Sequence, residues 1–148
     1  MPRHRIQMST IQVPNELLLS QVDTFLREGR EVIISAKGNS MLPFIRGDRD
    51  SVALRSCESP EIGDIVLVRL PGRYVMHRII GFRDGVYTMM GDGNIRGTES
   101  FRQEDVLGKV VRIIRDGKKD RTPGKGRLWK ALLPLRRYLL WIYRKFAI

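Results

Sequence analysis

The chain has 148 residues, 42% hydrophobic and 29% charged, which favours one globular domain and excludes wholesale disorder or collagen-like structure. Its single cysteine excludes an intramolecular disulfide and a cysteine-based zinc site, and we expect no metal and no cofactor. Residues 1–108 carry equal numbers of acidic and basic side chains, so the whole net charge of +11 lies in residues 109–148 and favours an anionic partner.

A helix is the first predicted element. Apolar residues recur at helical spacing after Asn15, which is the candidate N-cap, and Gly29 ends the pattern. The β-branched residues of the segment 31–36 then predict a strand. Glycine and proline in the segment 38–43 predict a loop after it.

Short strands separated by turns follow this loop. Asp84-Gly85 favours a type I′ hairpin turn, which needs positive φ angles. The apolar run from Ile65 to Val68 indicates a strand buried on both faces. Such frequent turns favour a mainly β fold with an antiparallel sheet. The predicted strands are residues 50–54, 64–70, 74–82, 86–90 and 106–114.

Four segments of different composition follow one another along the chain. We expect an N-terminal arm and helix (1–30), a β domain (31–114), a polar linker (115–127) and a basic amphipathic C-terminal helix (128–148). On a wheel of the last segment Lys130, Arg137, Arg144 and Lys145 gather on one side, and Leu132, Leu135, Leu139, Ile142 and Phe146 on the other. Arg136 lies off the basic side, and Pro134 marks a break or the first turn of the main helix.

The C-terminal segment allows two interpretations. Trp129, Trp141, Tyr138 and Tyr143 are residue types that prefer a membrane interface, and the bases attract anionic lipid. The alternative is an ordinary terminal helix whose apolar side packs on the body. No apolar run approaches the roughly 18 residues of a transmembrane helix, and the start lacks the apolar run of a signal peptide. We therefore expect a cytoplasmic or peripherally membrane-associated protein, without deciding between Met1 and Met8 as the initiator.

Three side chains are candidates for chemistry. Ser40 sits in the loop after a predicted strand, where serine is usually a turn residue. His77 is the one histidine besides His4, and a serine nucleophile needs such a base. The Asp84-Gly85 hairpin folds the strand before Asp92 back beside the strand of His77. A carboxylate there could fix the tautomer of the imidazole, as in serine triads.

Six short motifs occur along the chain in an order that resembles the signal peptidase I family of serine peptidases, whose relatives include the self-cleaving LexA-type repressors. The resemblance covers roughly residues 32–111. The motifs are Gly38-Asn39-Ser40-Met41-Leu42-Pro43, Arg46-Gly47-Asp48, Gly63-Asp64-Ile65-Val66, His77-Arg78-Ile79-Ile80, Gly91-Asp92-Gly93-Asn94 and Asp105-Val106-Leu107-Gly108-Lys109-Val110.

This resemblance implies a partly closed β-sheet and a catalytic set of Ser40, His77 and Asp92. Ser40 matches the family nucleophile, and His77 stands where bacterial members have a lysine base and the archaeal and endoplasmic-reticulum branch has histidine. The resemblance also implies that Gly38, Asn39 and Met41, beside the nucleophile, bind substrate. That branch usually has a further acid a few residues beyond the Gly91-Asp92 motif. Here Glu99 is near that position, so the third triad member is Asp92, Glu99 or absent.

The resulting hypothesis is a serine endopeptidase of the signal peptidase type that cleaves a peptide or precursor protein by a Ser/His mechanism. The alternative is a catalytically inactive peptidase-like module that binds an extended peptide along a sheet edge. A self-cleaving regulator is disfavoured because only 39 residues precede Ser40. An anionic membrane surface is a partner in one of the two interpretations of residues 128–148. We expect no specific nucleic acid, because no DNA- or RNA-reading motif occurs.

Overall fold

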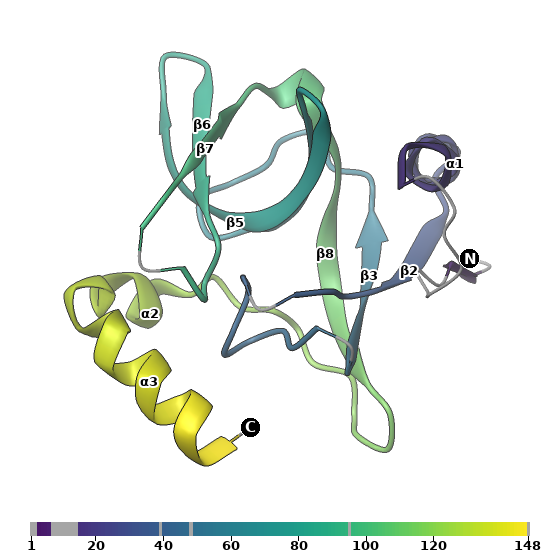
Figure 1. The fold of residues 1–148 in the computed structure, drawn as a ribbon. Coiled ribbons are helices and arrows are strands. Elements are labelled where there is room, and N and C mark those ends of the chain that lie inside the picture. The colour runs from purple at the N-terminus through teal and green to yellow at the C-terminus, as the bar shows by residue number, and fades with distance from the viewer. Residues whose placement is uncertain (1–2, 7–14, 39, 48, 95, 148) are drawn as a thin grey trace.

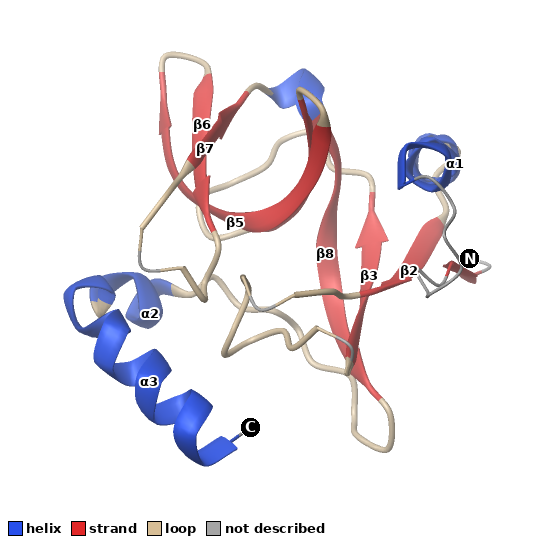
Figure 2. Cartoon of the chain, viewed as in Figure 1, coloured by secondary structure: helices blue, strands red, loops and turns tan. Residues whose placement is uncertain are grey.

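The protein is mainly β, with one curled sheet flanked by helices from both ends of the chain (Figures 1 and 2). The computed structural model describes residues 3–6, 15–38, 40–47, 49–94 and 96–147. The strands are β1 (Arg3–Ile6), β2 (Glu31–Ser35), β3 (Asp50–Arg55), β4 (Ile65–Leu70), β5 (Arg73–Arg83), β6 (Val86–Met90), β7 (Glu99–Phe101) and β8 (Val106–Arg115). The helices are α1 (Asn15–Arg27), α2 (Arg127–Ala131) and α3 (Arg136–Ala147), with 3₁₀ turns η1 (Gln103–Asp105) and η2 (Leu133–Leu135).

The sheet has the strand order β1-β2-β3-β8-β4-β5-β6-β7. Strands β2 to β8 pair only antiparallel, as predicted, and β1 adds to β2 in parallel. Among the described residues the two edge strands β1 and β7 do not pair, so the sheet is not closed. Figure 1 places β6 and β7 on one side of the molecule and the N-terminal strand on the other. The sheet therefore curls without closing.

Helix α1 packs on the sheet as its apolar spacing predicts. Leu19, Val22 and Leu26 are buried together with residues of β2, β3, β4 and β8 in the larger core cluster. The helix ends where Gly29 adopts a φ of +80°, with hydrogen bonds from Gly29 N to Leu26 O and from Arg30 N to Phe25 O. A left-handed residue after a helix is adopted by glycine at little cost, so the sequence marks this helix end correctly.

Strand β4 lies between two cores, as its continuous apolar run predicts. Ile65 and Leu67 join the cluster beneath α1, while Val66 and Val68 join a second cluster with β5, β6 and β7. Residues of a strand alternate between its two faces, so one strand can serve both clusters. The hairpin that follows is also confirmed: Asp84 and Gly85 have φ angles of 51° and 79°, and β6 starts at Val86.

The C-terminal segment breaks at Pro134. Helix α2, the 3₁₀ turn η2 and helix α3 replace a single continuous helix, and Pro134 lies in η2. Figure 1 shows α3 extending away from α2 at the side of the molecule below β6 and β7. Among the described residues, no helix has the length and apolar character needed to cross a membrane.

Candidate active site

A groove with a volume of about 980 Å³ contains Ser40, His77 and Glu99 on its wall. It runs between the loop that joins β2 to β3 and the first half of β5. Its other walls mix apolar and basic side chains, among them Leu67, Met41 and Met76 with Lys37, Arg69 and Arg73. Two of the three candidate catalytic residues from the sequence therefore share one groove, and Glu99 joins them.

The loop that carries Ser40 is tightly folded. Gly47 N donates to Gly38 O at 3.1 Å, and a Cβ atom at Gly47 would lie 2.3 Å from that oxygen. Gly38 has a φ of +77°, which favours glycine. Beyond Ser40, the amides of Phe44 and Ile45 both donate to Met41 O. Close glycine contacts and a short turn thus hold the serine in the loop after β2.

Asp50, the first residue of β3, closes this loop. Its buried carboxylate accepts hydrogen bonds from Arg46 N at 2.8 Å and from the Nε atoms of Arg49 and Arg115 at 3.1 and 2.9 Å. Burial alone would raise the pKa of Asp50, but the hydrogen bonds from Arg115, Arg46 and Arg49 outweigh burial and hold this pKa below its usual range. The folded protein therefore favours the ionised form.

The hydrogen bonds to the Asp50 carboxylate predict that the protein loses stability in acid. Because the folded-state pKa of Asp50 is depressed, its contribution is complete above the ordinary aspartate range and is lost as pH falls through the lowered value. Asp50→Asn should lower the free energy of unfolding by about 3 kcal/mol at pH 7, by less as the pH falls below about 4. Urea unfolding at several pH values measures this, with exposed Asp116→Asn as the control. Equal pH dependence of wild type and Asp50→Asn would contradict it.

His77 lies on β5 and contacts Glu99 of β7. Its Nδ1 atom is 2.6 Å from Glu99 Oε1, and both side chains are largely buried. Glu99 pairs with Met89 of β6, and Met89 pairs with Ile79 of β5, so the middle strand brings the carboxylate to the histidine. A carboxylate on Nδ1 favours the tautomer that leaves Nε2 unprotonated, which is the tautomer of a general base.

Gly91 brings Ser40 and His77 together. A Cβ atom at this position would lie 2.3 Å from Ser40 O and 3.0 Å from His77 Nε2, so both residues flank the same glycine. Gly93 N also donates to Ser40 O at 2.7 Å. Within the described part of the chain, no hydrogen bond joins the Ser40 hydroxyl to His77. Such bonds are often long in the absence of substrate.

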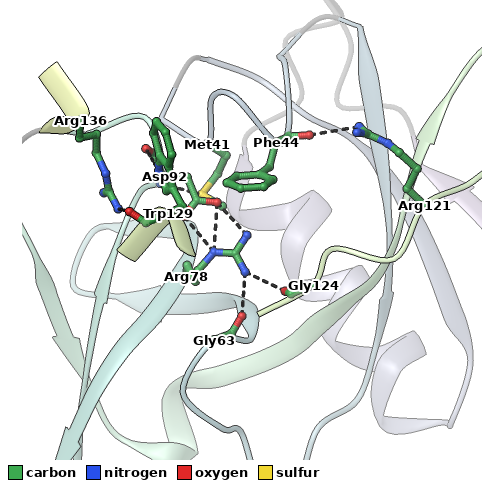
Figure 3. Close-up of polar contacts among 9 residues, drawn as sticks. All are labelled: Met41, Phe44, Gly63, Arg78, Asp92, Arg121, Gly124, Trp129 and Arg136. Carbon is green, nitrogen blue, oxygen red and sulfur yellow. Dashed lines mark hydrogen bonds and ion pairs between the residues drawn. The ribbon is translucent and has the colours of Figure 1, made fainter. Parts of the chain in front are cut away.

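Asp92 does not take the position next to the histidine. Its carboxylate accepts hydrogen bonds from Arg78 Nε at 2.9 Å and Arg78 Nη2 at 2.8 Å, and the two side chains are 2% and 3% exposed (Figure 3). His77 and Arg78 are consecutive in a strand and point to opposite faces, and Asp92 lies on the face of Arg78. Burial raises the pKa of Asp92, and the Arg78 guanidinium opposes that rise. The carboxylate on the imidazole is Glu99, the alternative that the sequence left open.

Arg78, which was not among the candidate residues, makes contacts with several segments of the chain. Its Nη1 atom donates to Gly63 O at 2.9 Å and Gly124 O at 2.8 Å, and its guanidinium lies 5.1 Å from the centroid of the Phe44 ring (Figure 3). The signal was present: an arginine inside an apolar strand needs a buried carboxylate partner. Arg78 therefore joins β5, the linker and the loop of Ser40.

The C-terminal helices pack on the loop that follows β6. Trp129 Nε1 donates to Asp92 O at 2.8 Å, and Arg136 donates to Asn94 O at 3.3 Å and Trp129 O at 3.4 Å (Figure 3 labels Trp129 and Arg136). Arg136 is buried at 3% exposure and lies 5.1 Å from the centroid of the Trp129 ring. Residues of α2 and of the start of α3 thus contact the loop that places Gly91 between Ser40 and His77.

The three residues expected to bind substrate have different positions. Gly38 is exposed on the groove, and Met41 lines it while its sulfur accepts a hydrogen bond from Asp92 N at 3.5 Å. Asn39 lies outside the described residues. In the part of the chain that the structure describes, no group of three or more His, Cys, Asp or Glu side chains has the arrangement of a metal site.

Neither a known protein-family model nor a curated protein sequence matches the chain. The interpretation of the site therefore depends on its geometry.

Proposed function

We propose that the protein is a serine endopeptidase that cleaves a peptide or precursor protein, with a site of the signal peptidase type. The observation that supports this most directly is the 2.6 Å contact between His77 and Glu99 in the same groove as Ser40. A nucleophile, a base and a carboxylate that orients the base are the elements of a serine triad. Gly91 adds support, since only a residue without a side chain fits between Ser40 and His77.

In the proposed mechanism, Ser40 Oγ attacks the scissile carbonyl while His77 Nε2 accepts its proton. The Glu99 carboxylate accepts the hydrogen bond from Nδ1–H and stabilises the imidazolium as it forms. His77 then gives the proton to the leaving amine, and water attacks the acyl-enzyme in the same way. The Ser40 amide is the candidate donor to the oxyanion, because no other described residue accepts its hydrogen bond.

An extended peptide fits the edge of β5 beside the site. The pairing of β5 with β6 starts at Arg78, so residues 73–77 have one strand edge that no described strand occupies. This edge borders the groove and leads to His77. A substrate that adds as a strand there would bring its backbone toward the base, and its side chains would alternate between the groove and solvent.

Labelling with a fluorophosphonate, which reacts with activated serines, tests the proposal. We expect covalent labelling of the wild-type protein and none of Ser40→Ala. Ser35→Ala, which removes another serine of the groove, should label as the wild type does. Cleavage of a peptide library by the wild type should likewise be lost in Ser40→Ala. Unchanged labelling or turnover in Ser40→Ala would disprove the role of Ser40.

The second candidate function is a peptidase-like module that binds peptides without cleaving them. The absence of a hydrogen bond between the Ser40 hydroxyl and His77 among the described residues favours it, as does the open edge at residues 73–77. A wild-type protein that binds library peptides but reacts with no fluorophosphonate at any pH between about 5 and 9 would support this function instead.

A further inference from the structure

Helix α3 is attached to the body by one side only. Arg136 and Leu140, one turn apart, are 3% and 2% exposed and form the attached side. The opposite side presents large apolar rings to solvent: Tyr138 is 66% exposed, Trp141 59% and Phe146 77%. Exposed apolar residues that gather on one helix face mark a surface that contacts a partner.

The basic side of the helix is exposed as well and adjoins these rings. Arg137, Arg144 and Lys145 are all exposed, and Lys145 Nζ lies 4.8 Å from the centroid of the Trp141 ring and 5.9 Å from that of Phe146. No acidic residue follows Asp120 in the sequence, so no carboxylate of this segment offsets these charges. The surface combines aromatic rings with uncompensated positive charge, and it is complementary to an anionic surface with an apolar interior.

We propose that the exposed side of α3, made of Arg137, Tyr138, Trp141, Ile142, Arg144, Lys145 and Phe146, binds the surface of an anionic phospholipid bilayer. Tryptophan and tyrosine prefer the headgroup level of a bilayer, while lysine and arginine reach the lipid phosphates. A helix of 12 residues is too short to cross the hydrocarbon layer, so it lies in the plane of the interface.

The pattern of this surface favours a bilayer over a protein groove. A helix that enters a groove on a partner presents a continuous apolar stripe at i, i+3, i+4 and i+7. On α3, Tyr138, Leu139, Ile142 and Phe146 keep such apolar spacing, but Arg137 and Lys145 lie on either side of Trp141 on the wheel. Exposed aromatic rings with bases beside them are typical of a helix in an anionic bilayer interface. The fixed contacts of Arg136 and Trp129 with the loop after β6 also mean that bilayer binding would hold the body in one orientation.

Co-sedimentation of the full-length protein with vesicles tests this proposal. We expect binding to vesicles of phosphatidylcholine and phosphatidylglycerol (3:1) and little to pure phosphatidylcholine. At low salt the triple variant Arg137→Gln/Arg144→Gln/Lys145→Gln should bind roughly 100-fold more weakly. The matched control Arg27→Gln/Arg83→Gln/Lys118→Gln removes the same charge from exposed sites elsewhere and should bind nearly as the wild type does.

Fluorescence locates the contact. The chain has two tryptophans, so a blue shift with anionic vesicles that disappears in Trp141→Phe assigns the contact to α3. Phe146→Ser should weaken binding, while Phe82→Ser, an exposed phenylalanine of β5, should not. Equal weakening by the two triple variants, or no wild-type binding to anionic vesicles, would overturn the proposal. A dimer in sedimentation equilibrium that Phe146→Ser dissociates would do so too, because a second copy would then cover this surface. None of these measurements depends on peptidase activity.

Discussion

Glu99→Gln should lower kcat for a cleaved peptide by up to about 10⁴-fold with little change in KM, because the loss of an orienting carboxylate has effects of that size in serine triads. The glutamine amide can donate to Nδ1, which places the imidazole proton on Nε2, where it cannot accept the proton of Ser40. Removal of the negative charge also makes the imidazolium less favourable. Both effects lower the rate of proton transfer from Ser40.

A control variant and a second measurement make this test specific. Glu104→Gln changes an exposed glutamate of η1, which follows β7, and should leave both kcat and KM unchanged. Fluorophosphonate labelling of Glu99→Gln should slow in parallel with kcat. If kcat fell together with a large rise in KM and a loss of stability in urea unfolding, Glu99 would have only a structural role. Unaltered turnover would remove it from the mechanism altogether.

The second large effect is expected from Asp92→Asn, which should lower the free energy of unfolding by about 3 kcal/mol or more. This change would leave the Arg78 guanidinium buried without a carboxylate partner, held by the carbonyl oxygens of Gly63 and Gly124 and by a neutral amide. Activity should fall as well, since Asp92 follows the glycine that lies between Ser40 and His77.

Urea unfolding measures the loss, and Asp23→Asn is the matched control. Asp23 forms an exposed ion pair with Arg27 within α1, so its replacement should cost less than about 0.5 kcal/mol. An Asp92→Asn protein of wild-type stability that has lost its activity would mean that Asp92 acts in catalysis, as the sequence-based hypothesis held.

Long elements were predictable because their signals are local. The apolar spacing of α1, the Asp84-Gly85 turn and the run in β4 each follow from residues that are close in the sequence. Strands β1 and β7 were not predicted. β7 has three residues, Glu99 to Phe101, too few for an alternating pattern, and it forms by pairing with the edge of β6. The sequence therefore could not place Glu99 next to His77.

The position of Asp92 shows a second limit of structure prediction from the sequence. The hairpin does bring the end of β6 beside the strand of His77, as predicted, and Met90 pairs with Arg78. A register shift between Ile79 and Gly81 helps set which residues are opposite each other, and such a bulge cannot be counted from sequence spacing. The C-terminal segment was also not fully predictable. A helical wheel drawn through Pro134 assumes one continuous helix, whereas the chain changes direction there and Arg136 and Leu140 are buried.

The contacts between Arg78 and the C-terminal segment affect how the site matures during synthesis. Ser40 and His77 leave the ribosome before Gly124 and Trp129, which are about 50 residues further along than the histidine and take several seconds to add at roughly 5–20 residues per second. Until they dock, Arg78 and Asp92 lack the contacts that hold the loop of Gly91. The nascent chain then has Ser40 and His77 without their final geometry, so under the proposed peptidase function cleavage of neighbouring chains at the ribosome is disfavoured.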